Sequence, residues 1–310
     1  MPKFVLLTIT GCLLSFFVIA QVPAYYRQDK KFTESLKNIT SDLGLTGNYD
    51  VGEDGMEQVS FAVIDLTGRK PVLGGVNFEN FIYPASVYKM YVAMEVLKQV
   101  SEGKYQLSQP YIVRSPNDVD KTREVAHDPR PLLKNGDTVT INYLLDLMIT
   151  RSDNSAANCL IDIAGRPNIN KTMQENGWHG SEVTRKFLKR KLEDPGYDTV
   201  KSTETSALHA ADFMYKIFTD QLVNPWVSMQ MKALLGRQLD KTKLAAGLPS
   251  SAMFYHKSGW WSFYTHDVGI VDDGQVKYII AFFSPVKEED IRPVMKKISR
   301  KVFELVKSRK

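Results

Sequence analysis

The order of apolar and polar residues predicts an amphipathic helix near the start of the chain. Phe32, Leu36, Ile39 and Leu43 recur every three or four residues within residues 30–43. Residues at this spacing share one face of an α-helix, so this segment can bury that face against a hydrophobic surface. We expect a β-sheet to provide that surface.

Runs of β-branched and aromatic residues bounded by turn residues predict strands at both ends of the chain. Five strands are expected, at residues 59–66, 71–78, 254–258, 267–271 and 278–283. Thr67-Gly68-Arg69-Lys70 and Asp272-Asp273-Gly274 are typical turn sequences and each joins two of these strands. The first two strands therefore form a hairpin that leads the chain to residue 86.

Helical periodicity dominates the region between the two groups of strands. Helices are expected at residues 86–100, 138–149, 155–164, 206–218 and 226–239, and a last one at 290–306. Residues 108–137 and 167–198 show little periodicity and are expected to be irregular, and loops of such length often serve a function. This order predicts an α/β (α+β) fold in which both chain ends build the sheet and an all-α lobe is inserted.

Length and composition exclude several classes of protein. The chain has 310 residues, of which 43% are hydrophobic and 24% charged, so it can bury a large core and is not disordered. The formal net charge of +5 is small and scattered, so we expect no nucleic-acid partner. One large domain or two closely packed lobes is the expected organisation.

Residues 1–20 predict a secretory signal peptide. Lys3 precedes an apolar run at residues 4–19, and Val18-Ile19-Ala20 suits a cleavage site. We therefore expect a secreted or periplasmic protein without stable membrane association after cleavage. Retention of the segment as an anchor, or lipidation at Cys12, is the alternative. Cleavage would leave Cys159 as the only thiol, which excludes an intrachain disulfide.

The first candidate for chemistry is Ser86-Val87-Tyr88-Lys89, at the start of a predicted apolar helix. Residues three apart share a helix face, so the Lys89 amine can reach the Ser86 hydroxyl. A lysine buried there would have a lowered pKa and could accept the serine proton. The same spacing occurs by chance elsewhere, at Ser101 with Lys104 and at Ser284 with Lys287, but neither of these pairs opens an apolar helix.

Two further short motifs follow. Ser152-Asp153-Asn154 lies between two predicted helices, and Lys257-Ser258-Gly259 lies on a predicted strand. Each has an ordinary structural explanation, as a helix cap or as an edge strand. The three motifs occur in the order Ser-x-x-Lys, Ser-Asp-Asn, Lys-Ser-Gly, and their first residues are 66 and then 105 positions apart. This ordered set matches the one found in penicillin-recognising serine enzymes.

From about residue 36 to residue 306 the sequence resembles the class A β-lactamase-like serine hydrolases, which share their fold with penicillin-binding D,D-peptidases. The resemblance implies an α/β sandwich with a five-stranded antiparallel sheet. It also implies one catalytic domain over residues 21–310, with a sheet lobe at about 30–85 and 245–310 and a helical lobe at about 86–244. The active site is then expected between the lobes.

The resemblance assigns a role to each motif. Ser86 is the expected nucleophile and Lys89 the base that takes its proton, directly or through water. Ser152 with Lys257 is expected to return the proton to the leaving nitrogen. The expected reaction is the hydrolysis of β-lactams through an acyl-enzyme at Ser86.

The substrate-binding residues follow from the same resemblance. Lys257 and Ser258 are expected to bind the carboxylate shared by β-lactams and by the D-alanyl end of peptidoglycan stems, on the strand that continues through Gly259. Backbone N–H groups of Ser86 and Trp260 are expected to form the oxyanion hole. Asn154 is expected to bind the acyl side-chain amide.

One part of the family pattern is missing. Class A β-lactamases carry a glutamate that activates the water for deacylation, and matching the loop puts Phe187, Leu188 or Lys189 near its place. Glu193 is the nearest acid and is therefore the candidate deacylation base. The alternative is that Glu193 is an ordinary surface acid, because it lies beside basic residues.

Two other functions remain open. A D,D-peptidase or transpeptidase acting on peptidoglycan would tolerate the missing glutamate, and a non-catalytic binding module would keep the fold alone. We expect no cofactor, because the five histidines show no metal-ligand spacing. The expected partner is a small-molecule β-lactam or a peptidoglycan-derived substrate, bound by a monomer.

Overall fold

A computed structural model describes residues 20–188 and 200–310 of the chain. Its central element is a six-stranded sheet with the order β1-β5-β4-β12-β11-β10. The strands are β1 (Arg27–Gln28), β4 (Ser60–Asp65), β5 (Val72–Val76), β10 (Met253–Trp261), β11 (Tyr264–Asp272) and β12 (Lys277–Ser284). The five predicted strands are thus confirmed as one antiparallel array built from both ends of the chain.

The sixth strand was not predicted from the sequence. β1 pairs in parallel with β5, with Arg27 opposite Val72. Two residues are too few to show any periodicity, so only the tertiary contact with β5 defines this strand.

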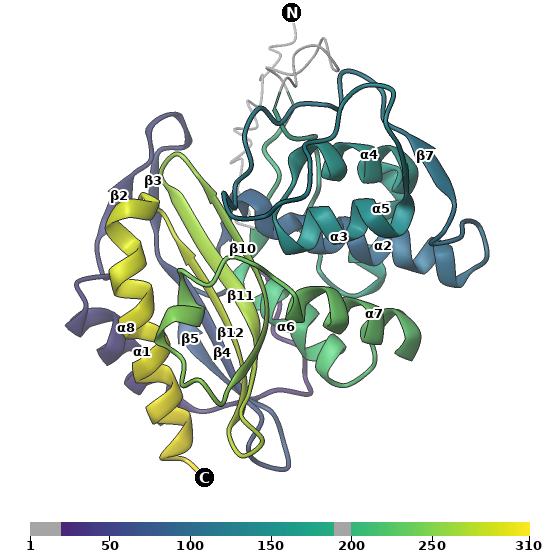
Figure 1. Cartoon of the computed structure of the whole chain (residues 1–310). Coiled ribbons are helices and arrows are strands. Elements are labelled where there is room, and N and C mark those ends of the chain that lie inside the picture. The colour runs from purple at the N-terminus through teal and green to yellow at the C-terminus, as the bar shows by residue number, and fades with distance from the viewer. Residues whose placement is uncertain (1–19, 189–199) are drawn as a thin grey trace, which may run out of the picture.

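Side chains of the central strands alternate between two hydrophobic cores, as the period of a strand requires. Phe61 and Val63 of β4 face one core, whereas Ala62 and Ile64 face the other. Because both faces are buried, the strand is apolar at nearly every position. The sheet is therefore the middle layer of a sandwich (Figure 1).

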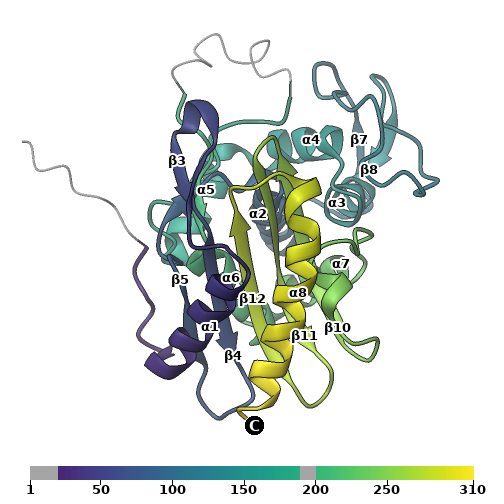
Figure 2. The same ribbon diagram turned by 90° about the vertical axis from the view of Figure 1, so that its left-hand side faces the viewer.

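Two helices from the chain ends cover the outer face of the sheet. They are α1 (Lys30–Asp42) and α8 (Glu288–Lys307), and they lie side by side in front of the sheet in Figure 2. Phe32 and Leu36 of α1 are fully buried there, which confirms the predicted amphipathic helix. Asp29 caps α1 by accepting a hydrogen bond from Phe32 N at 3.1 Å.

The remaining helices lie on the opposite side of the sheet (Figure 1). They are η2 (Ala85–Tyr88), α2 (Lys89–Ser101), α3 (Ile141–Thr150), α4 (Asn154–Ala164), α5 (Arg166–Glu175), α6 (Ala207–Phe218) and α7 (Pro225–Gly236). Of these, α6 packs directly on β4, β11 and β12. α2 is apolar on nearly all sides and almost entirely buried, so it is the central helix of this half.

Two of the sequence predictions in this half were wrong in part. α5 occupies residues predicted to be irregular, because its face is mostly polar and only Ile169, Thr172 and Met173 are buried. Residues 138–140, predicted as helix, form strand β8 (Thr138–Thr140), which pairs with β7 (Pro110–Ile112). The helix begins at Ile141 instead, and Thr140 is its cap as predicted.

Four short elements complete the described chain. They are the strands β2 (Asn48–Asp50), β3 (Met56–Gln58), β6 (Phe81–Ile82) and β9 (Thr205–Ser206). Two short helical turns, η1 (Gly52–Asp54) and η5 (Leu244–Gly247), are also present. Within residues 20–188 and 200–310, no helix has the length and apolar character needed to span a bilayer. The predicted division into signal peptide and catalytic domain stays a prediction.

Replacement of Leu36 tests the outer core. Leu36 is fully buried between α1 and the sheet, so Leu36→Ala should leave a cavity and lower the free energy of unfolding by about 2–5 kcal/mol in urea denaturation. Met56→Ala, at a side chain that is 64% exposed, should change it by less than about 0.5 kcal/mol. Equal effects of the two changes would contradict this packing.

Candidate active site

Ser86 lies in η2, the tight turn that starts the central helix. The turn is entered through Ala85, whose φ of 45° lies in the left-handed region that side chains other than glycine rarely adopt. Such strain persists only where the surroundings fix it, and it concentrates at functional sites. Ser86 is 7% exposed and lines a pocket.

Lys89 stands one turn further along the same helix and is fully buried. Its Nζ donates to Ser86 Oγ at 3.0 Å, to Ser152 Oγ at 3.1 Å and to Asn154 Oδ1 at 2.8 Å. The carbonyl oxygen of Ser152 is a fourth acceptor, at 2.5 Å. An ammonium has three protons, so these four acceptors more than satisfy it, and the predicted contact between Ser86 and Lys89 is present.

Ser152 lies in the middle of the three-residue turn between α3 and α4. Its φ is 63°, again in the left-handed region, and its hydroxyl lies between two lysines. Lys257 Nζ donates to Ser152 Oγ at 3.0 Å, opposite the bond from Lys89. The hydroxyl therefore links the two amines, and within the described part of the chain no other group hydrogen-bonds to both.

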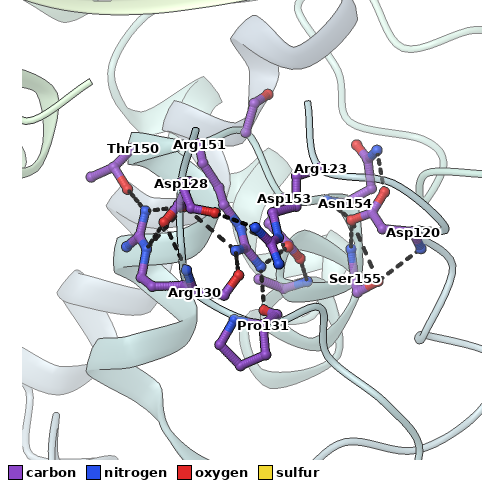
Figure 3. A network of polar contacts seen from close by, with 12 residues as sticks. Asp120, Arg123, Asp128, Arg130, Pro131, Thr150, Arg151, Asp153, Asn154 and Ser155 are labelled. Carbon is purple, nitrogen blue, oxygen red and sulfur yellow. Dashed lines mark hydrogen bonds and ion pairs between the residues drawn. The ribbon is translucent and has the colours of Figure 1, made fainter. Parts of the chain in front are cut away.

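The neighbouring residues hold this turn in place. Asp153 caps α4 by accepting from Ala156 N at 2.8 Å, and its other oxygen accepts from Arg151 Nη2 at 2.7 Å. Arg151 is buried and also donates to the carbonyl oxygens of Arg130 and Pro131, at 2.7 and 2.8 Å. Figure 3 shows how this guanidinium joins the turn to the loop that precedes α3.

The same loop supplies an acid that orients Asn154. Asp120 accepts from Asn154 N at 2.6 Å and from Asn154 Nδ2 at 2.8 Å (Figure 3). These bonds leave the amide oxygen of Asn154 to accept from Lys89 Nζ. Asp120 was not predicted as a site residue, because residues 108–137 show no periodicity that would place it.

Strand β10 brings the third motif to the site from the edge of the sheet. Lys257 is fully buried, and Gly259 lies directly against the start of the central helix. A Cβ atom on Gly259 would stand 2.8 Å from both Ser86 N and Val87 N, closer than real Cβ atoms come to a heavy atom. Only glycine lets the strand approach the turn this closely.

Burial lowers the pKa of both lysines. Desolvation lowers the pKa of Lys89 to about 8, although the carboxylates of Glu124, Asp120 and Asp153 oppose the shift. Desolvation, followed by repulsion from Lys89, lowers the pKa of Lys257 to about 7. Near neutral pH, each amine is therefore able to accept a proton, as a general base requires.

An aromatic ring lies over the Lys89 amine. The centre of the Phe187 ring is 4.3 Å from Lys89 Nζ, and the ring stacks on Tyr88 at 4.5 Å. Asn158 holds the Phe187 backbone through hydrogen bonds of 2.7 and 2.9 Å. Phe187 and Leu188, which the family pattern matches to the region of the missing glutamate, line the pocket together with Ser86.

Glu124 is a second acid that the sequence did not single out. Its side chain keeps contact with solvent, yet protein atoms crowd it, and this desolvation raises the pKa of Glu124 against the opposing charges of Lys89 and Lys257. Among the described residues no hydrogen bond or ion pair engages its carboxylate. Glu124 therefore acts on the two lysines through its charge alone.

The pocket beside Ser86 has a volume of about 290 Å³. Its walls combine polar motif residues with aromatic side chains: Tyr83, Ser86, Glu124, Ser152, Asn154, Phe187, Trp260 and Trp261. Trp260 and Trp261 are 41% and 48% exposed, so they form a rim of the pocket and are not core tryptophans. The cavity suits a small molecule with an apolar part.

A family model described as "Beta-lactamase enzyme family" matches residues 48–306. The chain belongs to the beta-lactamase enzyme family. Extended-spectrum beta-lactamase PER-1 of Pseudomonas aeruginosa is 26% identical over 211 residues, which cover 64% of this chain and 66% of that protein. The chain thus spans slightly less than two thirds of this relative's length.

Beta-lactamase VEB-1 of the same organism is 24% identical over 67% of this chain and 72% of its own length. Among solved structures, PBP-A has a TM-score of 0.75 at 20% identity, covering 93% of this chain and all of that one. An ancestral class A beta-lactamase has a TM-score of 0.70 at 21% identity, covering 88% and 99%. These structures confirm the predicted fold.

The structure brings together Ser86, Lys89, Ser152, Asn154, Lys257, Ser258, Gly259 and Trp260, and their roles in this beta-lactamase family chain stay predictions. Glu193 lies outside the described residues, so its role also stays a prediction. Two of the five histidines are in the core near the site: His256 pairs with Asp267 and His266 contacts the Tyr83 carbonyl. Within the described residues, no group of three or more possible ligands could hold a metal ion.

Replacement of Gly259 tests the close approach of β10. Gly259→Ala should force the strand away from Ser86 N and Val87 N, because both nearest atoms belong to the backbone. We expect Ser86 to be acylated by a β-lactam about 10–100-fold more slowly, as measured by intact mass. Gly47→Ala, where a new Cβ meets no atom within 4 Å, is the control, and a slowing of equal size there would contradict the explanation.

The charge of Glu124 can be tested through the pH dependence of acylation. If neutral Lys89 accepts the Ser86 proton, acylation should rise with pH, with a midpoint near the Lys89 pKa of about 8. Removing a neighbouring negative charge favours the neutral amine, so Glu124→Gln should move the midpoint of this rise in acylation rate to lower pH. Glu175→Gln, in an exposed acid that pairs with Lys98 and Lys171, should leave it in place. A shift to higher pH would show that Glu124 does not act on Lys89 by its charge.

Proposed function

We propose that this chain is an exported serine hydrolase that hydrolyses β-lactams through an acyl-enzyme at Ser86. The observation that carries the proposal is the link from Ser86 Oγ through Lys89 Nζ and Ser152 Oγ to Lys257 Nζ, in steps of 3.0, 3.1 and 3.0 Å. Both amines have lowered pKa values, so the link can both take up and release a proton.

Acylation begins when Ser86 Oγ attacks the carbonyl carbon of the lactam and its proton passes to neutral Lys89 Nζ. The C–N bond then breaks, and the nitrogen takes a proton from Ser152 Oγ, which regains one from the lysines. This leaves an ester at Ser86 and a neutral amine. Water then attacks the ester, which releases the acid and restores the Ser86 hydroxyl.

The relatives support a β-lactam substrate. The curated relatives are named beta-lactamases, and a variant of PBP-A has been solved as an acyl-enzyme complex with penicillin G. The Ser86 pocket has a size and an aromatic rim that suit such a molecule. The signal sequence at residues 1–20 supports export, and we propose that the protein acts as a monomer outside the cytoplasm.

A second candidate is a penicillin-binding D,D-peptidase or transpeptidase, in which the acyl-enzyme lasts. It is favoured by the ring of Phe187, which lies 4.3 Å from Lys89 Nζ in a region where class A β-lactamases carry their glutamate. A carboxylate there would activate water, whereas a phenyl ring excludes it. Glu193 is the acid proposed to restore hydrolysis.

Mass spectrometry with a penicillin and a chromogenic cephalosporin tests the proposal. We expect the chain without residues 1–20 to gain the mass of one β-lactam at Ser86, because Lys89 activates that hydroxyl. An adduct that disappears while colour develops supports hydrolysis, and one that persists supports the peptidase reading. Steady-state turnover and peptide mapping give the two measurements.

Two variants serve as controls. Ser86→Ala should abolish the adduct, whereas Ser101→Ala, in the chance Ser-x-x-Lys pair of α2, should leave its rate unchanged, because Ser101 is exposed at the end of the helix. An adduct that survives Ser86→Ala, or no adduct in the unaltered chain, would refute the assignment of the nucleophile.

A further inference from the structure

Hydrolysis of an acyl-enzyme needs a base that takes a proton from the attacking water. Phe187 and Leu188 line the pocket in the region of the missing glutamate, and neither side chain can accept a proton. In the described part of the chain, three acids line the same pocket: Asp120, Glu124 and Asp153. Each comes from a segment other than the one that carries Phe187.

Two of these three acids are already engaged. Asp120 accepts from the backbone N of Asn154 at 2.6 Å, and Asp153 pairs with Arg151 Nη2 at 2.7 Å. Glu124 differs from both, because among the described residues no hydrogen bond or ion pair reaches its carboxylate. Its oxygens are therefore free to accept a proton from a water molecule.

Neighbouring residues hold the backbone of Glu124. Before it in the chain, Asp120 is tied to the first residue of α4. Beside it, Arg123 Nη1 donates to the carbonyl oxygen of Asp128 at 2.6 Å, and Val125 is 8% exposed. Glu124 thus combines a fixed backbone with an unengaged carboxylate, which is the arrangement that a catalytic base requires.

The carboxylate of Glu124 lies close to the reacting groups. Among the carboxylates that act on Lys89, Glu124 has the largest effect, ahead of Asp120, which is itself linked to Lys89 through Asn154. Such an effect weakens with distance, and Lys89 Nζ lies 3.0 Å from Ser86 Oγ. Glu124 and Ser86 also line one pocket, so a water bound to this carboxylate would face an ester at Ser86.

Burial makes Glu124 a better base than an ordinary carboxylate. Desolvation raises the pKa of Glu124 above its ordinary value of 4.5, against the opposing charges of Lys89, Lys257 and Lys243 and with the support of Asp240. A carboxyl group whose pKa is moved toward neutral pH accepts a proton from water more readily. The second cavity that Glu124 lines carries charged or titratable groups of both signs: Asp240, Glu288, Lys243, Arg292 and His127.

We propose that Glu124 is the general base of deacylation. Its carboxylate takes a proton from water while the water oxygen attacks the ester carbon. As the C–O bond to Ser86 breaks, Ser86 Oγ takes a proton from the linked amines, and Glu124 then returns its own proton to them. One water is consumed, the acid is released and every side chain regains its starting state. This inference rests on the proposed acylation of Ser86, and Glu193 is the alternative base that the experiment distinguishes from it.

Decay of the penicillin G adduct tests the inference. The chain without residues 1–20 is acylated, the free penicillin is removed, and the loss of adduct from Ser86 is followed by intact mass. Glu124→Gln should slow this decay about 100-fold, because general-base catalysis contributes at least that much. Acylation of the same variant at pH 7 should not slow, because loss of the charge favours neutral Lys89. Glu175→Gln, in an exposed acid of α5, and Glu193→Gln should each change the decay by less than about threefold.

The pH dependence of the same decay is a second measurement. Glu124 must be ionised to act as a base, so deacylation should rise with pH to a plateau, with a midpoint above 4.5. Glu124→Gln should lack this rise.

Hydroxylamine distinguishes loss of a base from a blocked pocket. It is a strong nucleophile that attacks the ester with little help from a base, forms a hydroxamate and frees the Ser86 hydroxyl. With hydroxylamine present, the adduct of Glu124→Gln should decay within about tenfold of the rate of the unaltered chain.

These outcomes separate the inference from the function on which it rests. An adduct that decays as slowly in the unaltered chain as in Glu124→Gln overturns the role of Glu124 alone, and so does an equal or larger effect of Glu193→Gln. Decay of the Glu124→Gln adduct that hydroxylamine does not restore shows a blocked pocket and also overturns it. Absence of any adduct on Ser86 in the unaltered chain refutes the proposed function, and the inference with it.

Discussion

The site depends on one buried amine. Lys89 lies in the first turn of the central helix α2, where leaving water costs a lysine much of its preference for the charged form. Three nearby carboxylates recover part of that preference, so its pKa is lowered only to about 8, and four oxygen acceptors hold the amine in place. The same amine is therefore charged enough to be held in place and basic enough to accept a proton near neutral pH.

Three segments that are far apart in the sequence meet at this amine, and each is held by a different constraint. The central helix enters through the strained Ala85, the turn of Ser152 is fixed by Arg151, and strand β10 closes in through Gly259. All three constraints are backbone conformations or contacts within the protein itself. They show that much of the surrounding sequence serves to keep two lysines and two serines in one row, with about 3 Å between successive members.

The sequence predicted the parts of this structure that are repeated or ordered along the chain. The strands of the sheet and the helix of Leu36 follow from periodicity, and the three motifs from their order. Asp120 and Glu124 could not be found in this way, because they lie in a non-periodic segment and reach the site only through the tertiary fold. The polar helix α5 was missed for a related reason, since few of its residues are buried.

The charge of Lys257 depends on its neighbour Lys89. Repulsion between Lys89 and Lys257 adds to desolvation and lowers the pKa of Lys257 to about 7, so this residue gives up its charge more readily than an ordinary lysine. A lysine with so low a pKa is partly neutral near pH 7 and therefore holds an anion less strongly than an ordinary lysine. Because the Ser152 hydroxyl lies within hydrogen-bond distance of both amines, the proton held by one lysine affects the charge of the other across a single side chain.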